Sequence, residues 1–546
     1  MIGKVNSEAG FSTLVFLALL LMLSLLGINA IMTATDEVDI AGYELNATKA
    51  FYAAEAGLEE AAALITDHYE KWGKPPNSLP SGQITFGAYT VNWTVTKPGA
   101  TQLKTMTTGA YRGLYALSDE YQIESTASSP GVKARTKLTM TLDASVVPIY
   151  QFAVFYEDDL EIAPSPPMTI GGRVHSNNDM YLQSNNSLTI DSYTTAAGSI
   201  YHGRSPKSGK SDNYGDVLIN DKDGTPQNMK NPDGSWLDAT DPDWVSESIS
   251  RWGGLVEDKS HGITKLNLPV VSSGVPKDMI NRAGGGNADS YEHKADLKLI
   301  DGVVWYRGAD SIWNNVTTQF TDQGILTNNT FYDGREQTDA NSWDLDLGNL
   351  GSSSYWPASG IIYVDNDLSG LQGTRLVNGA ELHGALTVAS ANPLYTVGNY
   401  NTINKKAASV MTDAYTVLSN DWNDADSWSG IDSRIAGNTQ VNVAYMTGNK
   451  PSGAGSGTSY SGGFENLPRF LEDWSGKTFT WIGSAVDLWE SEQATGYWSY
   501  GGYYTPPDRN WFFDLAFLDP TNLPPGTPLI SVIQQTSWNE SIAYID

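Results

Sequence analysis

Paired carboxylates on short turns are the side chains of this sequence with the clearest chemical use. Asp221 and Asp223 form one pair with a single residue between them. Asp365 and Asp367 form another. Calcium prefers several oxygen ligands on flexible loops, so these four carboxylates are the candidate metal ligands, and calcium is the cofactor that they would hold. Neither pair follows the twelve-residue EF-hand pattern. The alternative is a solvated turn in which each aspartate caps its own backbone.

Clustered aromatic residues near the C-terminus are the second group with a chemical use. Residues 497–507 read Tyr-Trp-Ser-Tyr-Gly-Gly-Tyr-Tyr-Thr-Pro-Pro. Exposed tyrosine and tryptophan rings stack on sugars and anchor protein partners. Tyr500, Tyr503 and Tyr504 are therefore the candidate ligand-binding residues, for a surface glycan or a protein. The alternative is that these rings are buried in the cap that a repeat fold needs at its end.

Motifs of known catalytic centres are absent from the sequence. It contains no HExxH, no GxxxxGK, no GxSxG and no GxGxxG after a strand, and its 6 histidines are scattered. We therefore predict that the protein is not an enzyme. A membrane-anchored β-helix enzyme acting on carbohydrate is the alternative, because Asp365 and Asp367 would point to the same face of a strand.

Composition narrows the class of protein further. Among 546 residues, 33 are Lys or Arg and 62 are Asp or Glu, which gives a formal net charge of −29. A nucleic-acid partner held by phosphate contacts is excluded, because its phosphates would be repelled. The chain has no cysteine, which excludes disulfides, cysteine-bound zinc and thiol catalysis. The 53 glycines and 17 tryptophans favour a β-rich chain with many turns.

An apolar segment close to the N-terminus is long enough to cross a membrane. Residues 11–35 carry no charged side chain, and a spanning helix needs about 20 residues. Lys4 precedes the segment and an acidic chain follows it. The positive-inside rule then places the residues after about 35 outside the cytoplasm.

The same helix is predicted to continue well beyond the apolar segment. The first proline is Pro75, and the region before it is rich in Ala and Glu, which are strong helix formers. Phe51, Leu58 and Ile65 recur every seven residues and form one apolar stripe. A single helix from 11 to about 70 would be roughly 90 Å long.

This N-terminus resembles that of a type IV prepilin. A short leader ends in Gly10, Phe11 follows, and residues 50–57 read Ala-Phe-Tyr-Ala-Ala-Glu-Ala-Gly, as in PilX-like minor pilins. The resemblance implies cleavage after Gly10 by a prepilin peptidase, methylation of Phe11, and assembly through the helix that carries Val15, Phe51, Leu58 and Ile65. Major pilins have a glutamate where this chain has Val15, which favours a minor subunit. The alternative is a plain signal anchor.

The remainder of the chain is predicted to be mostly β structure, so the fold class is α+β. Alternating polar and apolar residues in 75–147 predict a small antiparallel β head. Short strands between Gly, Asn and Ser in 148–546 predict a β-solenoid-like domain, with a β-sandwich as the alternative. Short helices are expected at 245–252 and 407–419. The predicted divisions are leader 1–10, helix 11–74, β head 75–147 and large extracytoplasmic domain 148–546.

The function predicted from these features is that of a minor, tip-proximal type IV pilin-like subunit. It would wait in the inner membrane and then reach the cell surface in a pilus, where it would take part in pilus assembly and in adhesion or another surface interaction. Its partners would be other pilin or pseudopilin subunits and a prepilin peptidase. A domain as large as 148–546 could not repeat along a tightly packed shaft. The alternative is the tip pseudopilin of a type II secretion system.

Overall fold

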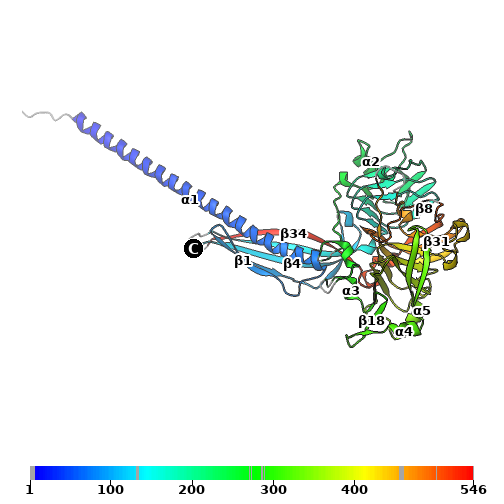
Figure 1. Cartoon of the computed structure of the whole chain (residues 1–546). Helices are drawn as coiled ribbons and strands as arrows, with labels where there is room; N and C mark the ends of the chain where they lie inside the picture. The colour runs from blue at the N-terminus through cyan, green and yellow to red at the C-terminus, as the bar shows by residue number, and fades with distance from the viewer. Residues whose placement is uncertain are drawn as a thin grey trace, which may run out of the picture.

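The structure is a computed structural model that describes residues 7–107, 109–130, 134–269, 271, 273–283, 287, 289–453, 460–499 and 501–544. A single helix, α1 (Ser7–Trp72), dominates the N-terminal part. Figure 1 shows its first half projecting alone and its second half lying along a sheet, with a larger body at the far end of that sheet. The uninterrupted helix follows from a segment without proline that is rich in Ala, Leu and Glu.

The sheet beside α1 is antiparallel and forms the pilin-like head. Its main strands lie in the order β1-β2-β4-β5-β34, and β3 pairs with β4. The bounds are β1 (Ser81–Phe86), β2 (Tyr89–Thr96), β3 (Gln102–Thr105), β4 (Tyr115–Ser128), β5 (Ala134–Pro148) and β34 (Leu529–Tyr544). The predicted long helix and antiparallel head are confirmed, and β34 is an addition that the sequence analysis did not include.

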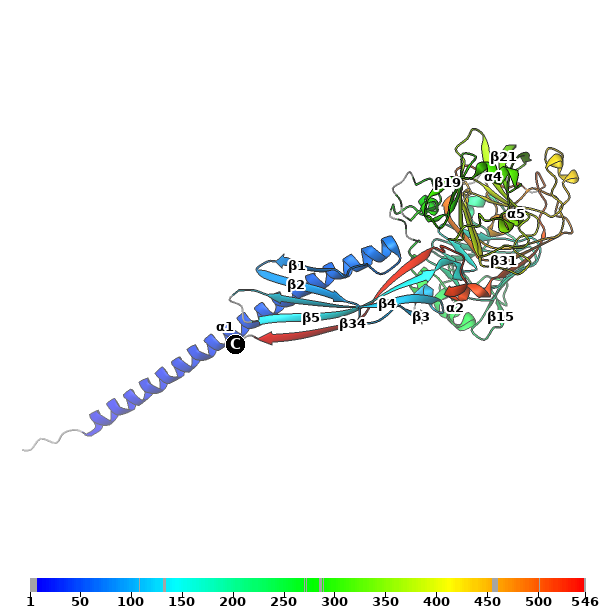
Figure 2. The same ribbon diagram turned by 90° about the horizontal axis from the view of Figure 1, so that it is seen from below.

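Strand β34 corrects the predicted boundary of the large domain, because the last strand of the chain belongs to the head. Leu529 pairs with Pro148, and the antiparallel pairing continues along the whole of β5. The amide of Ile149 donates to the carbonyl of Pro528 at 3.1 Å. Residues 149–528 therefore leave the head and return to it at one point. We call this inserted region the distal body; Figure 2 shows β5 and β34 side by side, with β5 leading to it and β34 returning from it.

Helix α1 packs on one face of the head sheet through its small and apolar residues. Leu58 and Ile65 are buried against the sheet, as the apolar stripe predicts, and Phe51 is partly buried at 5.6 Å from the ring of Trp538. A Cβ added to Gly57 would lie 2.6 Å from a methyl group of Val91. The glycine thus permits the close approach of helix and strand.

Tyr69 ties the end of α1 to the sheet by hydrogen bonds. Its buried hydroxyl donates to Asp119 Oδ2 at 2.6 Å and lies 2.9 Å from the hydroxyl of Tyr121. The carbonyl of Tyr69 accepts from Ser531 Oγ of β34 at 2.7 Å. Tyr69 therefore links the end of α1 to both β4 and β34.

Replacing Tyr69 with phenylalanine is expected to lower the free energy of unfolding of the head by about 2 kcal/mol, because a buried hydrogen bond to a carboxylate is lost and Asp119 stays buried. Chemical denaturation followed by circular dichroism measures this change. Tyr52 lies on the same helix but is 56% exposed, so Tyr52→Phe is the matched control and is expected to change stability by less than about 0.5 kcal/mol. Equal losses in the two variants would contradict the role given to Tyr69.

The distal body is built from stacks of short parallel strands. Ten strands of the described chain form one continuous parallel stack, which two antiparallel strands extend at one end. In spatial order they are β16 (Val256–Glu257), β12 (Thr194–Ala196), β9 (Val174–Ser176), β6 (Val154–Tyr156), β32 (Ala485–Glu490), β29 (Ala444–Asn449), β26 (Ala408–Thr412), β24 (Leu386–Ser390), β22 (Ile361–Asp365), β17 (Leu297–Ile300), β18 (Val303–Arg307) and β19 (Trp313–Asn315).

Smaller stacks complete the distal body beside this main stack. The first is β13 (Ile200–His202), β10 (Met180–Leu182) and β7 (Leu160–Ile162). The second is β15 (Pro226–Asn228), β14 (Asp216–Asn220), β11 (Ser187–Ile190) and β8 (Met168–Ile170). The third is β20 (Leu326–Asp333), β21 (Thr338–Asp346), β23 (Leu371–Val377), β25 (Leu394–Val397), β27 (Tyr415–Leu418) and β30 (Arg469–Phe470). The fourth is β28 (Thr439–Asn442), β31 (Thr478–Gly483) and β33 (Asp508–Phe513).

The order of strands in the main stack differs from their order along the chain. The chain enters at β6, in the middle of the stack, and moves outward through β9 and β12. It reaches one end of the stack at β16 and then forms β17, β18 and β19 at the opposite end. From β22 it returns inward until β32 pairs with β6. Entry and exit therefore lie together, which is what allows the chain to go back to the head as β34.

The helices of the distal body are short. They are α2 (Trp244–Trp252), α3 (Tyr291–Lys294), α4 (Thr317–Asp322) and α5 (Leu347–Ser352). The helix predicted at 245–252 is confirmed as α2. The helix predicted at 407–419 is wrong, because this segment forms β26 and β27. Both strands are buried on both faces, so their sequence carries no alternation of buried apolar and exposed polar residues to distinguish a strand from a helix. The predicted large β-rich C-terminal region is confirmed.

Candidate functional site

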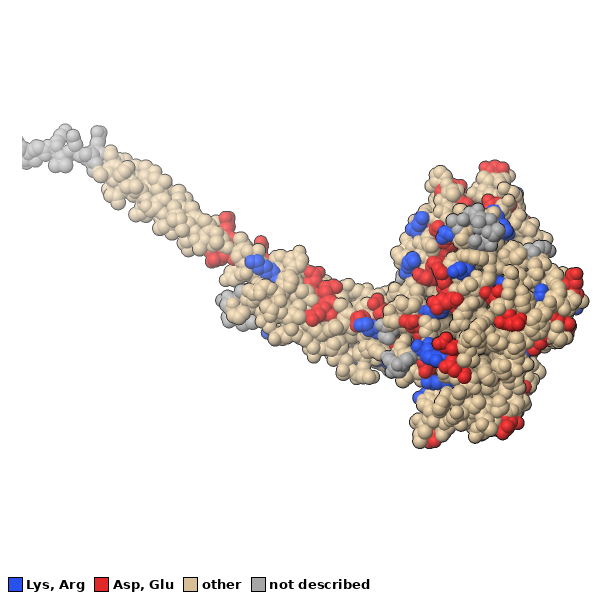
Figure 3. All heavy atoms as spheres, viewed as in Figure 1, with Lys and Arg blue, Asp and Glu red and all other residues tan. Residues whose placement is uncertain are grey.

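The projecting half of α1 is the most unusual surface of the molecule. Phe11 is 72% exposed and Val15 is 44% exposed, and the apolar side chains up to Met32 are exposed as well. Figure 3 shows this half of the helix without charged side chains, up to the acidic residues at its middle. By length and composition the helix could cross a membrane, a test that signal sequences near an N-terminus also pass. Such a surface needs lipid or other apolar helices around it.

The predicted processing site lies at the beginning of this helix. Because α1 starts at Ser7, the peptide bond between Gly10 and Phe11 belongs to its first turns. Val15 follows one turn later and brings no carboxylate to the apolar surface. Phe51, Leu58 and Ile65, by contrast, belong to the half of α1 that packs on the head.

The first pair of candidate calcium ligands is engaged in its own turn between β14 and β15. Asp221 Oδ1 accepts from the amides of Asp223 and Thr225, each at 2.9 Å, and its Oδ2 accepts from Gln227 Nε2 at 2.8 Å. These bonds lower the pKa of Asp221, the bond from Thr225 most strongly. Asp223 pairs with the exposed ammonium group of Lys222 at 2.8 Å. The turn is the self-capped aspartate turn that was the alternative to calcium.

The second pair of candidate ligands lies where β22 ends. Asp365 Oδ2 accepts from Arg282 Nε at 2.8 Å, and the amide of Asp367 donates to Asp301 Oδ1 at 2.8 Å. Asp365, Asp367 and Arg282 line a hollow of about 770 Å³. Within the described residues, no group of three or more His, Asp or Glu side chains is arranged to hold a metal ion. Of the four predicted calcium ligands, Asp221 thus accepts from backbone amides, Asp223 pairs with Lys222 and Asp365 pairs with Arg282.

The candidate ligand-binding tyrosines are buried wherever the structure describes them. Tyr503 is 6% exposed and Tyr504 is 3% exposed, and Tyr500 lies outside the described residues. The Tyr504 hydroxyl donates to Asn466 Oδ1 and accepts from Trp498 Nε1. An open stacking surface made by Tyr503 and Tyr504 was the wrong expectation: both rings pack in the core of the distal body.

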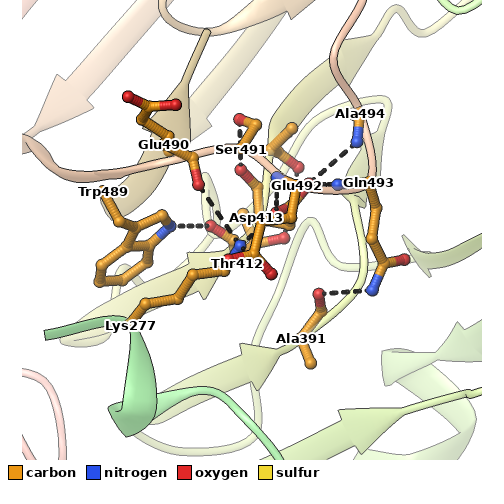
Figure 4. A network of polar contacts seen from close by, with 12 residues as sticks. Lys277, Ala391, Thr412, Asp413, Trp489, Glu490, Ser491, Glu492, Gln493 and Ala494 are labelled. Atoms are coloured by element: carbon orange, nitrogen blue, oxygen red, sulfur yellow. Dashed lines mark hydrogen bonds and ion pairs between the residues drawn. The ribbon is translucent and has the colours of Figure 1, made fainter. Parts of the chain in front are cut away.

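A buried ion pair fixes the segment after β32 (Figure 4). The carboxylate of Asp413 is fully buried; its Oδ1 accepts from Lys277 Nζ at 2.9 Å and from the amide of Glu492 at 2.7 Å. Its Oδ2 accepts from the amides of Gln493 and Ala494 at 3.0 and 2.9 Å. One carboxylate in the turn between β26 and β27 therefore holds a loop that is distant in the sequence.

A second buried carboxylate, that of Glu472, holds the turn after β27. Its two oxygens accept from the amide and the hydroxyl of Ser419, at 2.7 and 2.6 Å. Burial raises the pKa of Glu472 to about 7, with the nearby Asp421 adding to the rise, while the Ser419 bonds and Arg434 oppose it. The folded protein thus favours the protonated form of Glu472 more than the unfolded chain does.

Because folding raises the pKa of Glu472, we expect the distal body to lose stability as the pH rises toward neutrality. A carboxyl whose pKa is raised by folding stabilises the fold fully below its unfolded pKa, and that contribution is lost as the pH passes through the folded value. Between about pH 5 and about pH 7 the loss from Glu472 is expected to be roughly 2 kcal/mol. Thermal unfolding at several pH values measures it. Glu472→Gln is expected to flatten this slope, and an unchanged slope in that variant would contradict the assignment.

A cavity between the first strands of the distal body and residues 498–509 is the site that sequence reasoning missed. It has a volume of about 430 Å³, and six of its lining residues are aromatic or basic: Arg204, Lys210, Tyr460, Trp498, Tyr504 and Arg509. These residues come from three distant parts of the sequence, so no local motif could have indicated them. We call this site the Trp498 cavity.

The overall arrangement defines the class of the protein. An apolar helix that projects from an antiparallel head, with its second half packed on the sheet, is the architecture of a type IV pilin-like subunit. The N-terminal segment is of the PilX type, because residues 9–59 match the family model described as PilX N-terminal. Pilins in general are assembly subunits and not enzymes. Their apolar helix anchors them in the membrane before assembly.

Among the solved structures, one pilin is similar to this chain over most of its length. The crystal structure of the competence-associated pilin ComZ from Thermus thermophilus matches with 10% sequence identity and a TM-score of 0.28. The match covers 91% of this chain and 98% of that one. No curated protein matches the chain.

Proposed function

We propose that the protein is a minor, tip-proximal subunit of a type IV pilus that takes part in pilus assembly and in adhesion. One observation carries this proposal: residues 149–528 are inserted between two adjacent strands of the head, β5 and β34. The distal body therefore sits at the end of the head away from the projecting half of α1 (Figure 1). Its two connections to the head are paired strands.

The size and attachment of the distal body support a place at or near the tip. Subunits of a helical filament repeat a single contact along the shaft. The distal body makes up most of the chain, and a copy of it on every head would occupy the space of the neighbouring heads. The absence of a glutamate at Val15 agrees with this position, since the PilX-type resemblance implies a minor subunit.

We also infer that the distal body is solenoid-like and stiff. Val154, Val174 and Thr194 pair in register in β6, β9 and β12, and they are equally spaced along the sequence. Leu160, Met180 and Ile200 do the same in the neighbouring stack. Parallel strands that return at a fixed interval are the pattern of stacked rungs. A stiff body held by two paired strands would transmit a pulling force to the head.

The remaining parts of the proposal concern processing, location and partners. The chain would be cleaved after Gly10 by a prepilin peptidase and methylated at Phe11. It would reside in the inner membrane and then join other pilin subunits through α1, with the distal body at the cell surface. The exposed apolar helix supports this order, because it requires lipid first and neighbouring apolar helices later.

The test is to locate the protein on sheared surface filaments. Gold labelling with an antibody against the distal body is expected to mark filament ends, and quantitative mass spectrometry is expected to find this chain at less than about one hundredth of the major pilin, as a low-stoichiometry subunit must be. Label spaced along the shaft would contradict the tip position. Absence from filaments, with retention in the envelope, would support the tip pseudopilin of a type II secretion system instead.

A further inference from the structure

We propose that the Trp498 cavity binds an acidic sugar residue, one that carries a carboxylate or a sulfate group. The inference rests on the proposed surface-binding function and assigns it a site and a ligand class. The cavity volume of about 430 Å³ falls within the range of small-ligand pockets, roughly 300–1,000 Å³. Its lining combines cations with aromatic rings, which are the two groups that an anionic sugar needs.

The charge of the cavity is opposite to that of the protein as a whole. The chain has 33 basic residues against 62 acidic ones, yet Arg204, Lys210 and Arg509 all line this cavity, and Glu465 is the single acidic residue in the lining. The carboxylate of Glu465 accepts from the amide of Ala163 at 3.2 Å. A negatively charged group would therefore enter a positive cavity in an otherwise repelling surface.

Arg509 offers a charge that the protein does not neutralise directly. Its Nε and Nη2 atoms donate to the backbone carbonyl of Glu465 at 3.2 and 2.9 Å. Within the described residues Arg509 forms no ion pair, and the charge of Glu465 acts on it without such a contact. Burial lowers the pKa of Arg509, which means that its cationic form is poorly solvated where it stands. A ligand anion would supply the missing countercharge.

Arg204 also lines the cavity, and its partners fix its orientation. Its Nη1 donates to Glu161 Oε1 at 2.9 Å and to the hydroxyl of Tyr460 at 2.7 Å. Its Nε atom is buried and makes no hydrogen bond within the described residues. The guanidinium groups of Arg204 and Arg509 are thus both pre-positioned by bonds that leave donors unused, and a carboxylate or sulfate has the acceptors to use them.

The aromatic walls of the cavity are locked in position. The rings of Tyr460 and Trp498 meet edge to face with centroids 5.5 Å apart. Trp498 Nε1 donates to the Tyr504 hydroxyl at 2.5 Å. Arg204 and Lys210 lie over the Tyr460 ring, whereas the half-buried indole of Trp498 lines the cavity as an apolar wall. Sugar C–H groups pack well on such an indole, and this favours a saccharide over an acidic peptide.

Binding of defined oligosaccharides to the full chain in detergent tests the proposal. Trigalacturonate is the carboxylate probe, a sulfated trisaccharide is the sulfate probe, cellotriose is the neutral control and triglutamate is the peptide control. Titration followed by tryptophan fluorescence is expected to show saturable binding of at least one acidic sugar, at least about tenfold tighter than cellotriose or triglutamate. Equal binding of cellotriose, or tighter binding of triglutamate, would overturn the proposal.

Variants locate the binding to the cavity. Arg509→Gln and Lys210→Gln are each expected to weaken binding of the acidic sugar by about tenfold or more. Lys210 is exposed, so its variant tests the site even where Arg509→Gln fails to fold. Arg251→Gln is the matched control, because Arg251 also donates to backbone carbonyls and lies over a tryptophan ring, but outside the cavity. Unchanged affinity in both cavity variants would overturn the assignment of the binding site.

The location of the protein on filaments does not depend on this result. The filament-labelling experiment therefore reports a failure of the proposed function separately.

Discussion

Replacing Gly10 with valine is expected to leave the protein uncleaved and to remove it from the filament fraction. The peptidase implied by the resemblance cuts after Gly10, and a branched side chain at that position would clash where glycine presents only backbone. Processing is expected to fall more than about tenfold. The uncut leader places Lys4 and a charged N-terminal segment before the apolar helix, and such charges cannot enter a dry bundle of helices.

The measurement is the mass of the chain in isolated membranes, where the uncut form is heavier by the leader, residues 1–10. Gly27→Val is the matched control: Gly27 lies on the same exposed half of α1, and a Cβ there would meet nothing within 4 Å. It is expected to leave cleavage unchanged. Normal cleavage of the Gly10 variant, or lost cleavage in the Gly27 variant, would contradict the assignment of the processing site.

Replacing Asp413 with alanine is expected to destabilise the distal body by about 3–5 kcal/mol, because breaking a buried ion pair from one side leaves the remaining charge desolvated. The substitution leaves three backbone amides without their acceptor and removes a buried partner of Lys277, whose side chain is only 7% exposed. Glu492 also pairs with Lys277, at 3.0 Å, but its own side chain is 69% exposed and compensates little.

Thermal unfolding of the full chain, followed by tryptophan fluorescence, measures this effect, since Trp489 Nε1 donates to the carbonyl of Thr412 beside the site. Asp413→Asn retains the shape of the side chain and is expected to lose less stability than Asp413→Ala. Asp223→Ala removes an exposed ion pair and is expected to change stability by less than about 0.5 kcal/mol. A similar small change for Asp413→Ala would show that its network does not hold the loop.

The N-terminal half of the fold could be predicted from the sequence because its determinants are local. A proline-free stretch rich in Ala and Glu, with Leu58 and Ile65 in one stripe, is sufficient to predict helix α1 and its buried face. The alternation in β4 and β5 is equally local. What could not be predicted is β34, because the whole distal body separates it in sequence from its partner β5. Sequence spacing gives no information on such a pairing.

The distal body was harder to predict for two physical reasons. First, parallel strands such as β26 and β27 are buried on both faces, so their sequences lack the polar–apolar alternation that distinguishes a strand from a helix. Second, loops of unequal length interrupt the strand stacks. Even so, the segments at 154–162, 174–182 and 194–202 are equally long and equally spaced, and their comparison could have indicated the stacking before the structure was known.

The candidate sites show the same division between local and non-local information. The turn of Asp221 was recognisable as a self-capped turn, because its bonds run to residues only a few positions further along the chain. The Trp498 cavity was not, because Arg204, Tyr460 and Arg509 meet only after the chain has folded. Tyr503 and Tyr504 were predicted to be exposed ligand-binding residues, but both rings are buried in the core of the distal body.

The central claim is that this chain is a processed, filament-forming pilin-like subunit, and the most direct test is N-terminal mass spectrometry of the protein from sheared surface material and from membranes. We expect a mature chain that starts at methylated Phe11, with part of it in the sheared fraction at low stoichiometry. A chain that starts at Met1 or Ile2 and remains entirely in the membrane would contradict it.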